Sequence, residues 1–191
     1  MTNEHHNEFF DGLFYEDMLP LEWSRLEGEP DRAYLTHLNE SNDEMLRMLA
    51  IMEEHFSEKI DEGANFAAEI LRLEAKVNLL LDMVGQILAN HLMLPEQVPV
   101  RLGSRGIEFA HTKPPGANEL VLLTLYLQQR YPRPLELIGR VVSVEDSGQG
   151  AYWVRAKYEH LSSSVQDWLE KFIFRRHRRL VAHSRSGASS T

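Results

Sequence analysis

The sequence predicts an α+β protein: a long heptad-repeat helix, then a small antiparallel β-barrel that ends in a C-terminal helix. Three observations support this fold class. Apolar residues recur at alternating steps of four and three over residues 45–91, as in helices that pack on other helices. After Pro95 the apolar period changes to two, and short runs separated by turn residues follow. A helical period returns near the C-terminus.

Residues 1–40 are expected to form an irregular segment that docks on the rest of the chain. The apolar residues in it are too many for a free tail, and they are Phe9, Phe10, Phe14, Tyr15, Leu19, Leu21 and Trp23. Asn39 or Ser41 is expected to cap the helix that follows, because short polar side chains accept hydrogen bonds from first-turn amides.

Residues 41–94 are predicted to form the heptad-repeat oligomerisation helix. Its a and d positions stay in one register and are expected to form the oligomer interface through Leu49, Met52, Phe56, Phe66, Ile70, Leu73, Val77, Leu80, Val84 and Ile87. Lys59 and Gly63 interrupt the apolar pattern, and glycine disfavours a helix by about 1 kcal/mol. The unbroken register favours one continuous helix, and a helical hairpin that turns near Gly63 is the alternative.

The apolar stripe widens toward its C-terminal end, and this width indicates how many copies of the chain the bundle contains. Leu81 and Leu88 take e positions and Met83 takes a g position. These side chains need more partner surface than a dimer supplies, so we expect a parallel bundle of more than two chains, with a homotetramer favoured over a trimer. Packing of the stripe on the chain's own domain is the competing interpretation.

Residues 95–182 are predicted to form the barrel and its C-terminal helix. The five expected strands are QVPVRL (97–102), GIEFA (106–110), ELVLLTLYLQ (119–128), LELIGRVVSV (135–144) and AYWVRAKYEH (151–160). In the closing helix, one of the three serines 162–164 is the expected N-cap, and the apolar face comprises Val165, Leu169, Phe172 and Ile173. Residues 183–191 are expected to be a disordered tail.

Composition excludes several classes of protein. The chain has no cysteine, which excludes disulfides, thiolate zinc sites and a cysteine nucleophile. No catalytic or metal-ligand motif is present, so we expect no enzyme activity, no metal and no cofactor. No apolar run reaches the roughly 20 residues of a membrane helix, and no signal pattern opens the sequence, so we expect a cytoplasmic protein without membrane contact.

Charge divides the chain into two halves. Residues 1–96 hold 21 acidic and 6 basic residues, and residues 97–191 hold 8 acidic and 14 basic ones. This asymmetry suggests two units with different roles. The basic cluster at residues 175–179, RRHRR, is either a patch for an anion, a nucleic acid or an acidic partner, or a solvated helix end. The net charge of −9 argues against nucleic acid.

Four segments follow one another within residues 97–179: SRGIEF, then ELVLLTLYL, then GRVVSVE, then GAYWVRAKYEHLSSSVQDWLEKFIFRRHRR. Together they resemble a PilZ domain. With the preceding heptad helix, the chain is similar to the atypical, tetrameric PilZ proteins of xanthomonads. The resemblance implies a bacterial signalling protein connected with cyclic di-GMP, type IV pili, motility and virulence.

The nucleotide motif of the resemblance is degenerate in this chain. Typical PilZ domains bind cyclic di-GMP through two arginines four apart before the first strand, and through Asp or Asn, any residue, Ser, two residues and Gly. The segment 85–100 holds no arginine, Arg101 and Gly103 stand at the Asp/Asn and Ser positions, and Gly106 matches the final glycine. Because paired arginines grip phosphates bidentately, we expect no tight cyclic di-GMP binding. Gly106 is then expected at a turn or bulge with positive φ.

The function expected is therefore that of a non-enzymatic regulator. The oligomeric barrels would bind an unidentified protein partner through residues 101–105 or through the C-terminal helix. The alternative is a cyclic di-GMP sensor with a rearranged site that uses Arg101, Arg105 or Arg140.

Overall fold

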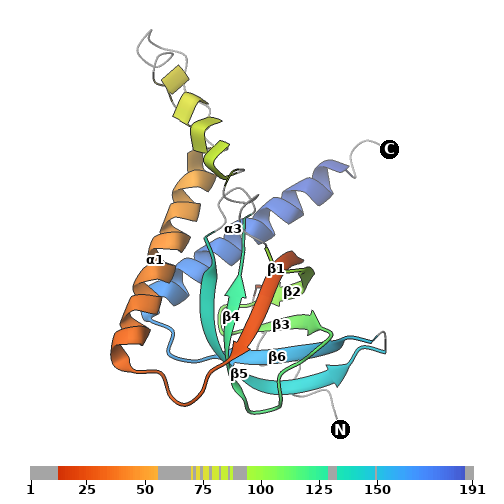
Figure 1. Cartoon of the computed structure of the whole chain (residues 1–191). Coiled ribbons are helices and arrows are strands. Elements are labelled where there is room, and N and C mark those ends of the chain that lie inside the picture. The colour runs from red at the N-terminus through yellow and green to blue at the C-terminus, as the bar shows by residue number, and fades with distance from the viewer. Residues whose placement is uncertain are drawn as a thin grey trace.

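The structure, a computed structural model, describes residues 13–55, 94–128, 133–148 and 150–187, and within 70–87 the positions 70, 72–73, 75–77, 79–81, 83–85 and 87. The elements are β1 (Tyr15–Arg25), α1 (Arg32–His55), β2 (Gln97–Leu102), β3 (Gly106–His111), β4 (Leu120–Leu125), β5 (Leu135–Asp146), β6 (Tyr152–Tyr158) and α3 (Ser163–Gly187). Figure 1 shows a barrel of strands with α1 and α3 packed against one side of it.

The six strands form a closed barrel in the order β1-β2-β3-β6-β5-β4, with every pair antiparallel. Alternate side chains point inward, so Leu102, Ile107, Phe109 and Val154 are fully buried in one core. The predicted α+β fold class, with an antiparallel barrel and a C-terminal helix, is confirmed. The five predicted strands are all present, with ends shifted by a few residues.

The first barrel strand lies in the segment predicted to be irregular. β1 pairs first with β2, with Tyr15 opposite Leu102, and then with β4, with Leu21 opposite Leu125. Pro20 lies where β1 changes partner, and its carbonyl accepts a hydrogen bond from the Tyr126 amide at 3.1 Å. The prediction of an irregular segment over 1–40 is therefore wrong for β1, because proline and outward-facing charges hid the strand's period of two.

The helix α1 begins at Arg32, earlier than predicted. Asp31 is its N-cap, since the Asp31 carboxylate accepts a hydrogen bond from the Tyr34 amide at 2.7 Å. Asn39 and Ser41, the predicted caps, both lie within the helix, so that prediction is wrong. Asn39 and Asn42 instead tie α1 to the segment before α3 and to the barrel. Asn39 accepts a hydrogen bond from the Ser162 amide at 2.8 Å, and Asn42 bonds both backbone groups of Glu136.

Packing of α1 corrects the predicted oligomer interface at one position. Met45, Leu46 and Leu49 are each 1% exposed and lie in the same core as Val165 and Leu169 of α3. Leu49 therefore belongs to the chain's own core and is unavailable to another copy. Periodicity alone could not distinguish these two kinds of burial, because both place apolar residues on one helix face.

The described positions of 70–87 form a second helical segment with the opposite direction. In Figure 1, α1 runs away from the barrel, whereas these positions run back toward it, from yellow to yellow-green. Two helical segments therefore replace the single continuous helix predicted over 41–94. Residues 56–69, which include Gly63 and the predicted interface residues Phe56 and Phe66, lie outside the described residues, as does the Met52 side chain.

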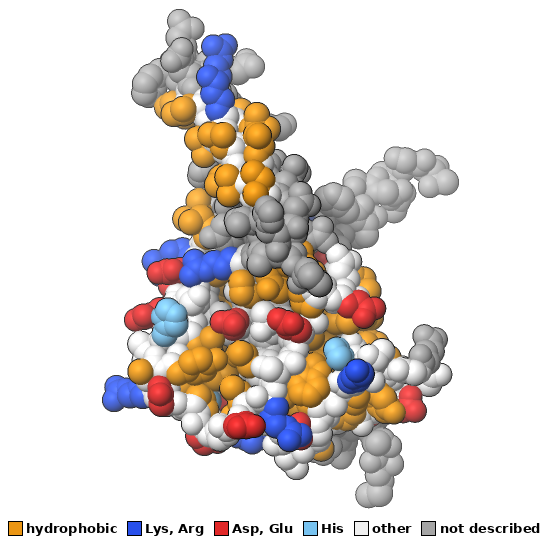
Figure 2. Space-filling model, viewed as in Figure 1, with side chains coloured by type: hydrophobic (Ala, Val, Ile, Leu, Met, Phe, Trp, Pro, Cys, Tyr) orange, Lys and Arg blue, Asp and Glu red, His pale blue; other side chains and the backbone are white. Residues whose placement is uncertain are grey.

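The apolar side chains described in 70–87 are exposed in the single chain. The exposed fractions of the predicted interface residues there are 46% for Ile70, 63% for Leu73, 46% for Val77, 61% for Leu80, 52% for Val84 and 55% for Ile87. Figure 2 shows hydrophobic side chains gathered along this projection above the barrel. An apolar stripe of this extent on a surface indicates an interaction site.

The C-terminal helix α3 covers one side of the barrel core. Ser162 is its N-cap and accepts a hydrogen bond from the Val165 amide at 3.2 Å, as predicted for this serine run. Val165, Leu169, Phe172 and Ile173 are buried. The helix reaches Gly187, so the tail predicted from residue 183 is helical over its first part. Within the described residues, no helix is long and apolar enough to cross a membrane.

Candidate functional site on the outer face of the barrel

The degenerate nucleotide motif forms the tight connection between β2 and β3. The Gly103 amide donates a hydrogen bond to the Gly106 carbonyl at 2.9 Å, and the Arg105 carbonyl accepts one from the Tyr158 amide at 3.0 Å. Gly106 is the first residue of β3 and pairs with Lys157 of β6. The structure thus brings the three predicted motif positions, Arg101, Gly103 and Gly106, to one end of two paired strands.

The predicted positive φ at Gly106 is wrong. Gly106 lies within a strand ladder, and the described glycines with positive φ are Gly28, Gly148 and Gly150. The turn is closed by backbone hydrogen bonds between residues of ordinary φ, so it does not require the conformational freedom of glycine at this position.

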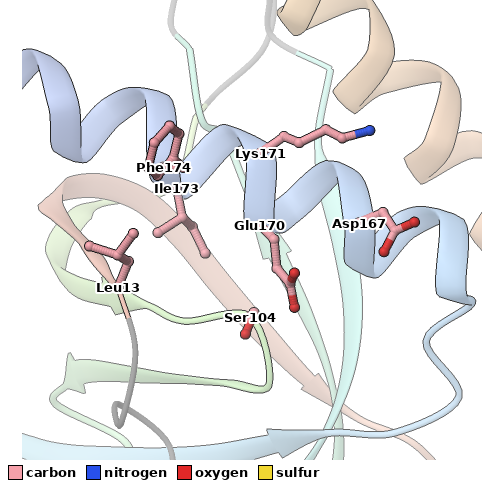
Figure 3. Close-up of a pocket in the computed structure, with 7 residues that line it drawn as sticks. All are labelled: Leu13, Ser104, Asp167, Glu170, Lys171, Ile173 and Phe174. Carbon is pink, nitrogen blue, oxygen red and sulfur yellow. The ribbon is translucent and has the colours of Figure 1, made fainter.

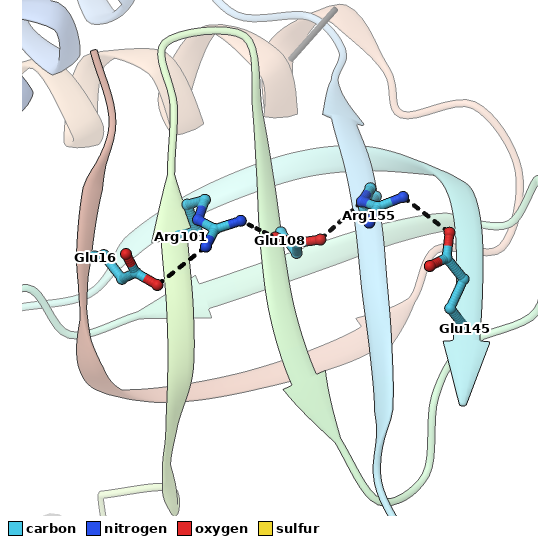
Figure 4. A network of polar contacts seen from close by, with 5 residues as sticks. All are labelled: Glu16, Arg101, Glu108, Glu145 and Arg155. Carbon is cyan, nitrogen blue, oxygen red and sulfur yellow. Dashed lines mark hydrogen bonds and ion pairs between the residues drawn. The ribbon is translucent and has the colours of Figure 1, made fainter. Parts of the chain in front are cut away.

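A ladder of alternating charges crosses the outer face beside this turn. Arg101 bonds Glu16 at 3.1 Å and Glu108 at 2.8 Å, and Arg155 bonds Glu108 at 2.7 Å and Glu145 at 2.8 Å. Figure 4 shows the five side chains in a row across β1, β2, β3, β6 and β5. Glu16, Arg101, Glu108 and Arg155 stand directly opposite one another in the strand register, which brings each pair within bonding reach.

Glu108 is the centre of this charge ladder. Its side chain is 5% exposed, and those of its partners Arg155 and Arg101 are 13% and 29% exposed. Each carboxylate oxygen of Glu108 accepts a hydrogen bond from a different guanidinium. A buried carboxylate is tolerated only when it is paired and hydrogen-bonded, so the two arginines make Glu108 possible at this position.

Arg101 contacts three side chains of this face at once. In addition to Glu16 and Glu108, its guanidinium lies over the Phe14 ring at 5.1 Å from the centroid. Arg101 occupies the position at which a typical PilZ domain carries the Asp or Asn that reads guanine. To bind a phosphate, Arg101 would have to release the buried carboxylate of Glu108, and a buried charge that loses a partner costs free energy.

The other arginines considered for a rearranged site differ in their freedom. Arg140 forms a bidentate pair with Glu159 at 2.7 and 2.9 Å, and the hydrogen bond and charge of Glu159 raise the pKa of the Arg140 guanidinium above its usual value. Arg105 lies in the turn and is exposed. Of these three arginines, Arg105 is therefore the one whose side chain is most accessible to an anion.

A pocket of about 650 Å³ lies between the turn and α3. It is lined by Leu13, Ser104, Asp167, Glu170, Lys171, Ile173 and Phe174. Figure 3 shows the apolar side chains at one end and the charged ones at the other. Two carboxylates and one ammonium leave the lining net negative, which disfavours a ligand that carries two phosphates.

The basic cluster 175–179 is partly packed on aromatic rings. The Arg176 guanidinium lies 5.3 Å from the Phe172 centroid and 5.7 Å from that of Tyr15, and Arg178 lies 5.8 Å from that of Phe174. Arginine over an aromatic face gains both packing and electrostatic energy. The structure therefore shows a packing role for part of the cluster. Among the described residues, no group of three or more His, Asp or Glu side chains gathers to hold a metal ion.

Sequence reasoning placed the motif turn correctly and missed the charge ladder. Glu108, Arg155, Glu16 and Glu145 were not singled out, although each lies in a strand whose inward positions are apolar. The available signal was the presence of opposite charges at outward positions of neighbouring strands. That signal can be used only when the strand order and register are known. Glu16 faces Arg101, and Glu108 faces Arg155, on strands that lie far apart in the sequence.

Comparison with known proteins decides the family. Residues 46–186 match the family described as the atypical PilZ domain, cyclic di-GMP receptor, which is more than half of the chain. The chain belongs to the atypical PilZ domain family. The match begins within α1, so the closing strand β1 of this PilZ protein lies outside it. No curated protein matches the chain.

A solved PilZ structure shares the fold over nearly the whole chain. It is a pathogenic protein from Xanthomonas campestris, described as a new tetrameric PilZ domain self-assembled via an unusual helical bundle. The TM-score is 0.74 at 24% identity, over 95% of this chain and 97% of that chain. The Bacillus subtilis inhibitor of motility MotI/DgrA has a TM-score of 0.37 at 16% identity, over 44% of this chain and 42% of that chain.

Proposed function

We propose that this atypical PilZ protein is a non-enzymatic cytoplasmic regulator that assembles as a homotetramer and acts on a protein partner without tight binding of cyclic di-GMP. The observation that carries the proposal is the apolar stripe of 70–87, whose described a and d residues are about half exposed in the single chain. Such side chains gain free energy when other copies cover them.

The relative from Xanthomonas campestris supports assembly through this stripe. That protein is tetrameric through a helical bundle, and its fold covers 95% of this chain. A bundle of this kind would display four barrels together. Several weak contacts to a partner would then act jointly, which raises avidity without any new contact chemistry.

The charge ladder supports the expectation about cyclic di-GMP. Arg101 is held by Glu16 and Glu108, the pocket beside Ser104 is net negative, and the segment 85–100 holds no arginine. The regulated process is proposed to be pilus function, motility or virulence, in line with the resemblance stated above.

The oligomer is tested by light scattering on a matched pair of variants. We expect the unaltered protein to have four times the mass of a 22.1 kDa chain. Leu80→Asp places a charge at a d position and should dissociate the assembly. Leu79→Asp is the control, because Leu79 is equally exposed at 60% against 61% but lies outside the a and d positions. A monomeric unaltered protein, or equal effects of the two variants, would contradict the bundle.

Ligand binding is tested by calorimetric titration with cyclic di-GMP at physiological salt. We expect no heat of binding at micromolar concentrations, since losing bidentate phosphate contacts costs several kcal/mol and each ~1.4 kcal/mol is tenfold in affinity. Binding at micromolar or lower concentration would overturn this part of the proposal.

The second candidate function is a cyclic di-GMP sensor with a rearranged site. The family description as a cyclic di-GMP receptor and the exposed side chain of Arg105 favour it. If the titration shows binding, Arg105→Ala should weaken it at least tenfold, because a phosphate contact from arginine is charge-assisted. Unchanged binding in that variant would place the ligand elsewhere.

A further inference from the structure

The exposed face of α3 carries a short stripe of three residues at steps of four. Glu170, Phe174 and Arg178 are all exposed, and the exposed fraction of Phe174 is 50%. Residues four apart lie on the same face of a helix, and the Arg178 guanidinium indeed lies over the Phe174 ring at 5.8 Å. We call these three residues the α3 stripe.

The α3 stripe has opposite charges at equal distances on either side of an aromatic residue. At 1.5 Å per residue, Glu170 lies about 6 Å before Phe174 along the helix axis, and Arg178 lies about 6 Å after it. A second copy turned by two-fold symmetry would present the same residues in reverse order. Glu170 would then meet Arg178 of the second copy, Arg178 would meet its Glu170, and the two Phe174 rings would meet at the axis.

We propose that α3 of one copy packs antiparallel on α3 of a second copy, with the two-fold axis at Phe174. The charges favour a second copy over a purely acidic or purely basic partner, because either of those would leave one end of the α3 stripe facing a like charge. Neither Glu170 nor Arg178 has an ion-pair partner within the described part of the chain.

The pocket beside Phe174 gives room for the ring of the second copy. Its apolar end comprises Leu13, Ile173 and Phe174, as Figure 3 shows, and its volume is about 650 Å³. An aromatic side chain seated in such a hollow is a common anchor of protein interfaces. Leu13 is 43% exposed, so it also gains burial when the hollow is filled.

This contact is separate from the apolar stripe of 70–87 and small in comparison. We therefore expect it to form between copies that the helical bundle already holds at high local concentration, a point that rests on the proposed function. It would join barrels in pairs and would fix their orientation within the assembly.

Disulfide trapping tests the pairing directly in the full chain, because the protein has no cysteine of its own. Phe174→Cys places the single thiol at the proposed axis, next to its equivalent in the second copy. The variant lacks the ring but keeps Glu170 and Arg178, whose opposite charges set the register of the pair. Ser163→Cys is the control, since this exposed residue of the same helix would lie about 33 Å from its equivalent in the antiparallel pair. Under mild oxidation we expect disulfide-linked dimers to form at least tenfold faster with Phe174→Cys.

Charge reversal on the Phe174→Cys chain tests the register. Arg178→Glu sets Glu170 against a like charge at both ends of the pair, and the crosslinking rate should fall roughly tenfold. Adding Glu170→Arg restores opposite charges, and the rate should recover. Equal rates in all three chains would overturn the proposal and would mean that the α3 stripe faces something other than its own copy.

Light scattering on the same samples separates this inference from the proposed function. An oligomer of unchanged mass in which Phe174→Cys crosslinks no faster than Ser163→Cys overturns the α3 pairing alone. A monomer contradicts the bundle, and the comparison of the two cysteine variants at raised protein concentration then decides the pairing by itself.

Discussion

Glu108 shows how a single residue organises the outer face of the barrel. It lies between two core residues of β3, Ile107 and Phe109, yet points outward and is buried beneath the two arginines that it binds. Its ion pairs with Arg101 and Arg155 offset the cost of removing these charges from water. Without the central carboxylate, two partly buried cations would lie close together with no negative charge between them.

Glu108→Ala is therefore expected to lower the free energy of unfolding by about 3–5 kcal/mol. The matched control is Glu145→Ala, which removes the outer end of the same ladder, where the side chain is 54% exposed and a pair contributes at most about 1 kcal/mol. Urea unfolding followed by circular dichroism measures both variants. A Glu108→Ala effect no larger than that of Glu145→Ala would mean that the ladder is not a stabilising unit.

Tyr158 is a second residue whose buried polar group lowers the stability of the fold. It is 8% exposed, its hydroxyl is buried without a hydrogen-bond partner among the described residues, and burial raises its pKa well above 10. The folded protein therefore keeps this phenol protonated at a pH where the unfolded chain releases the proton. The free energy of unfolding is unaffected by ionisation of this group below pH 10. It falls as the pH rises above 10, because only the unfolded chain releases the proton there.

Tyr158→Phe should leave the free energy of unfolding at pH 7 unchanged or raise it by up to about 1 kcal/mol, because the unpaired hydroxyl is removed. Above pH 10 the loss of stability should become shallower by up to about 1.4 kcal/mol per pH unit. Denaturant titrations at several alkaline pH values measure the slope. Tyr34→Phe is the comparison, since the pKa of Tyr34 is raised less strongly. An unchanged slope in Tyr158→Phe would show that the hydroxyl is solvated.

At the scale of the element, β1 is the strand that completes the barrel. It fills the gap between β2 and β4, and its Tyr15, Leu19 and Leu21 side chains enter the core. Without it, two strand edges lose their hydrogen-bond partners and the core opens on one side. The 97–179 region that resembles a PilZ domain therefore does not contain a complete barrel.

Deleting residues 1–25 is expected to abolish cooperative thermal unfolding, because the remaining sheet cannot close. Deleting residues 1–12 is the control, since it keeps all of β1. Differential scanning calorimetry compares the two shortened chains with the full one. A cooperative transition in the chain that lacks 1–25 would mean that five strands suffice for a stable barrel.

At the scale of the whole molecule, ion pairs join the acidic and basic halves. Arg101 pairs with Glu16, Arg133 with Glu44 at 3.0 Å, and Arg140 with Glu29 at 3.5 Å. In each pair the cation comes from the second half and the carboxylate from the first. These pairs show that part of the acidic half bonds directly to the basic half within the folded chain.

Several features of this protein could be read from the sequence. The five strands from Gln97 onward and the helix α3 were predictable, because apolar residues at a period of two or at helical spacing are local signals. The degenerate motif was visible for the same reason, since its positions Arg101, Gly103 and Gly106 lie within one short segment. The apolar stripe of 70–87 was also local.

Other features required the tertiary structure. The role of β1 depends on β2 and β4, which lie about a hundred residues away along the chain, and Pro20 interrupts its pattern. The burial of Leu49 was decided by packing of α1 on α3, because the same periodicity serves a core within the chain or an interface between chains. The charge ladder arose only from the strand order, which sets opposite charges side by side on five strands. Side-chain period is a local property of the chain, whereas the partner of each buried face is fixed by contacts between distant segments.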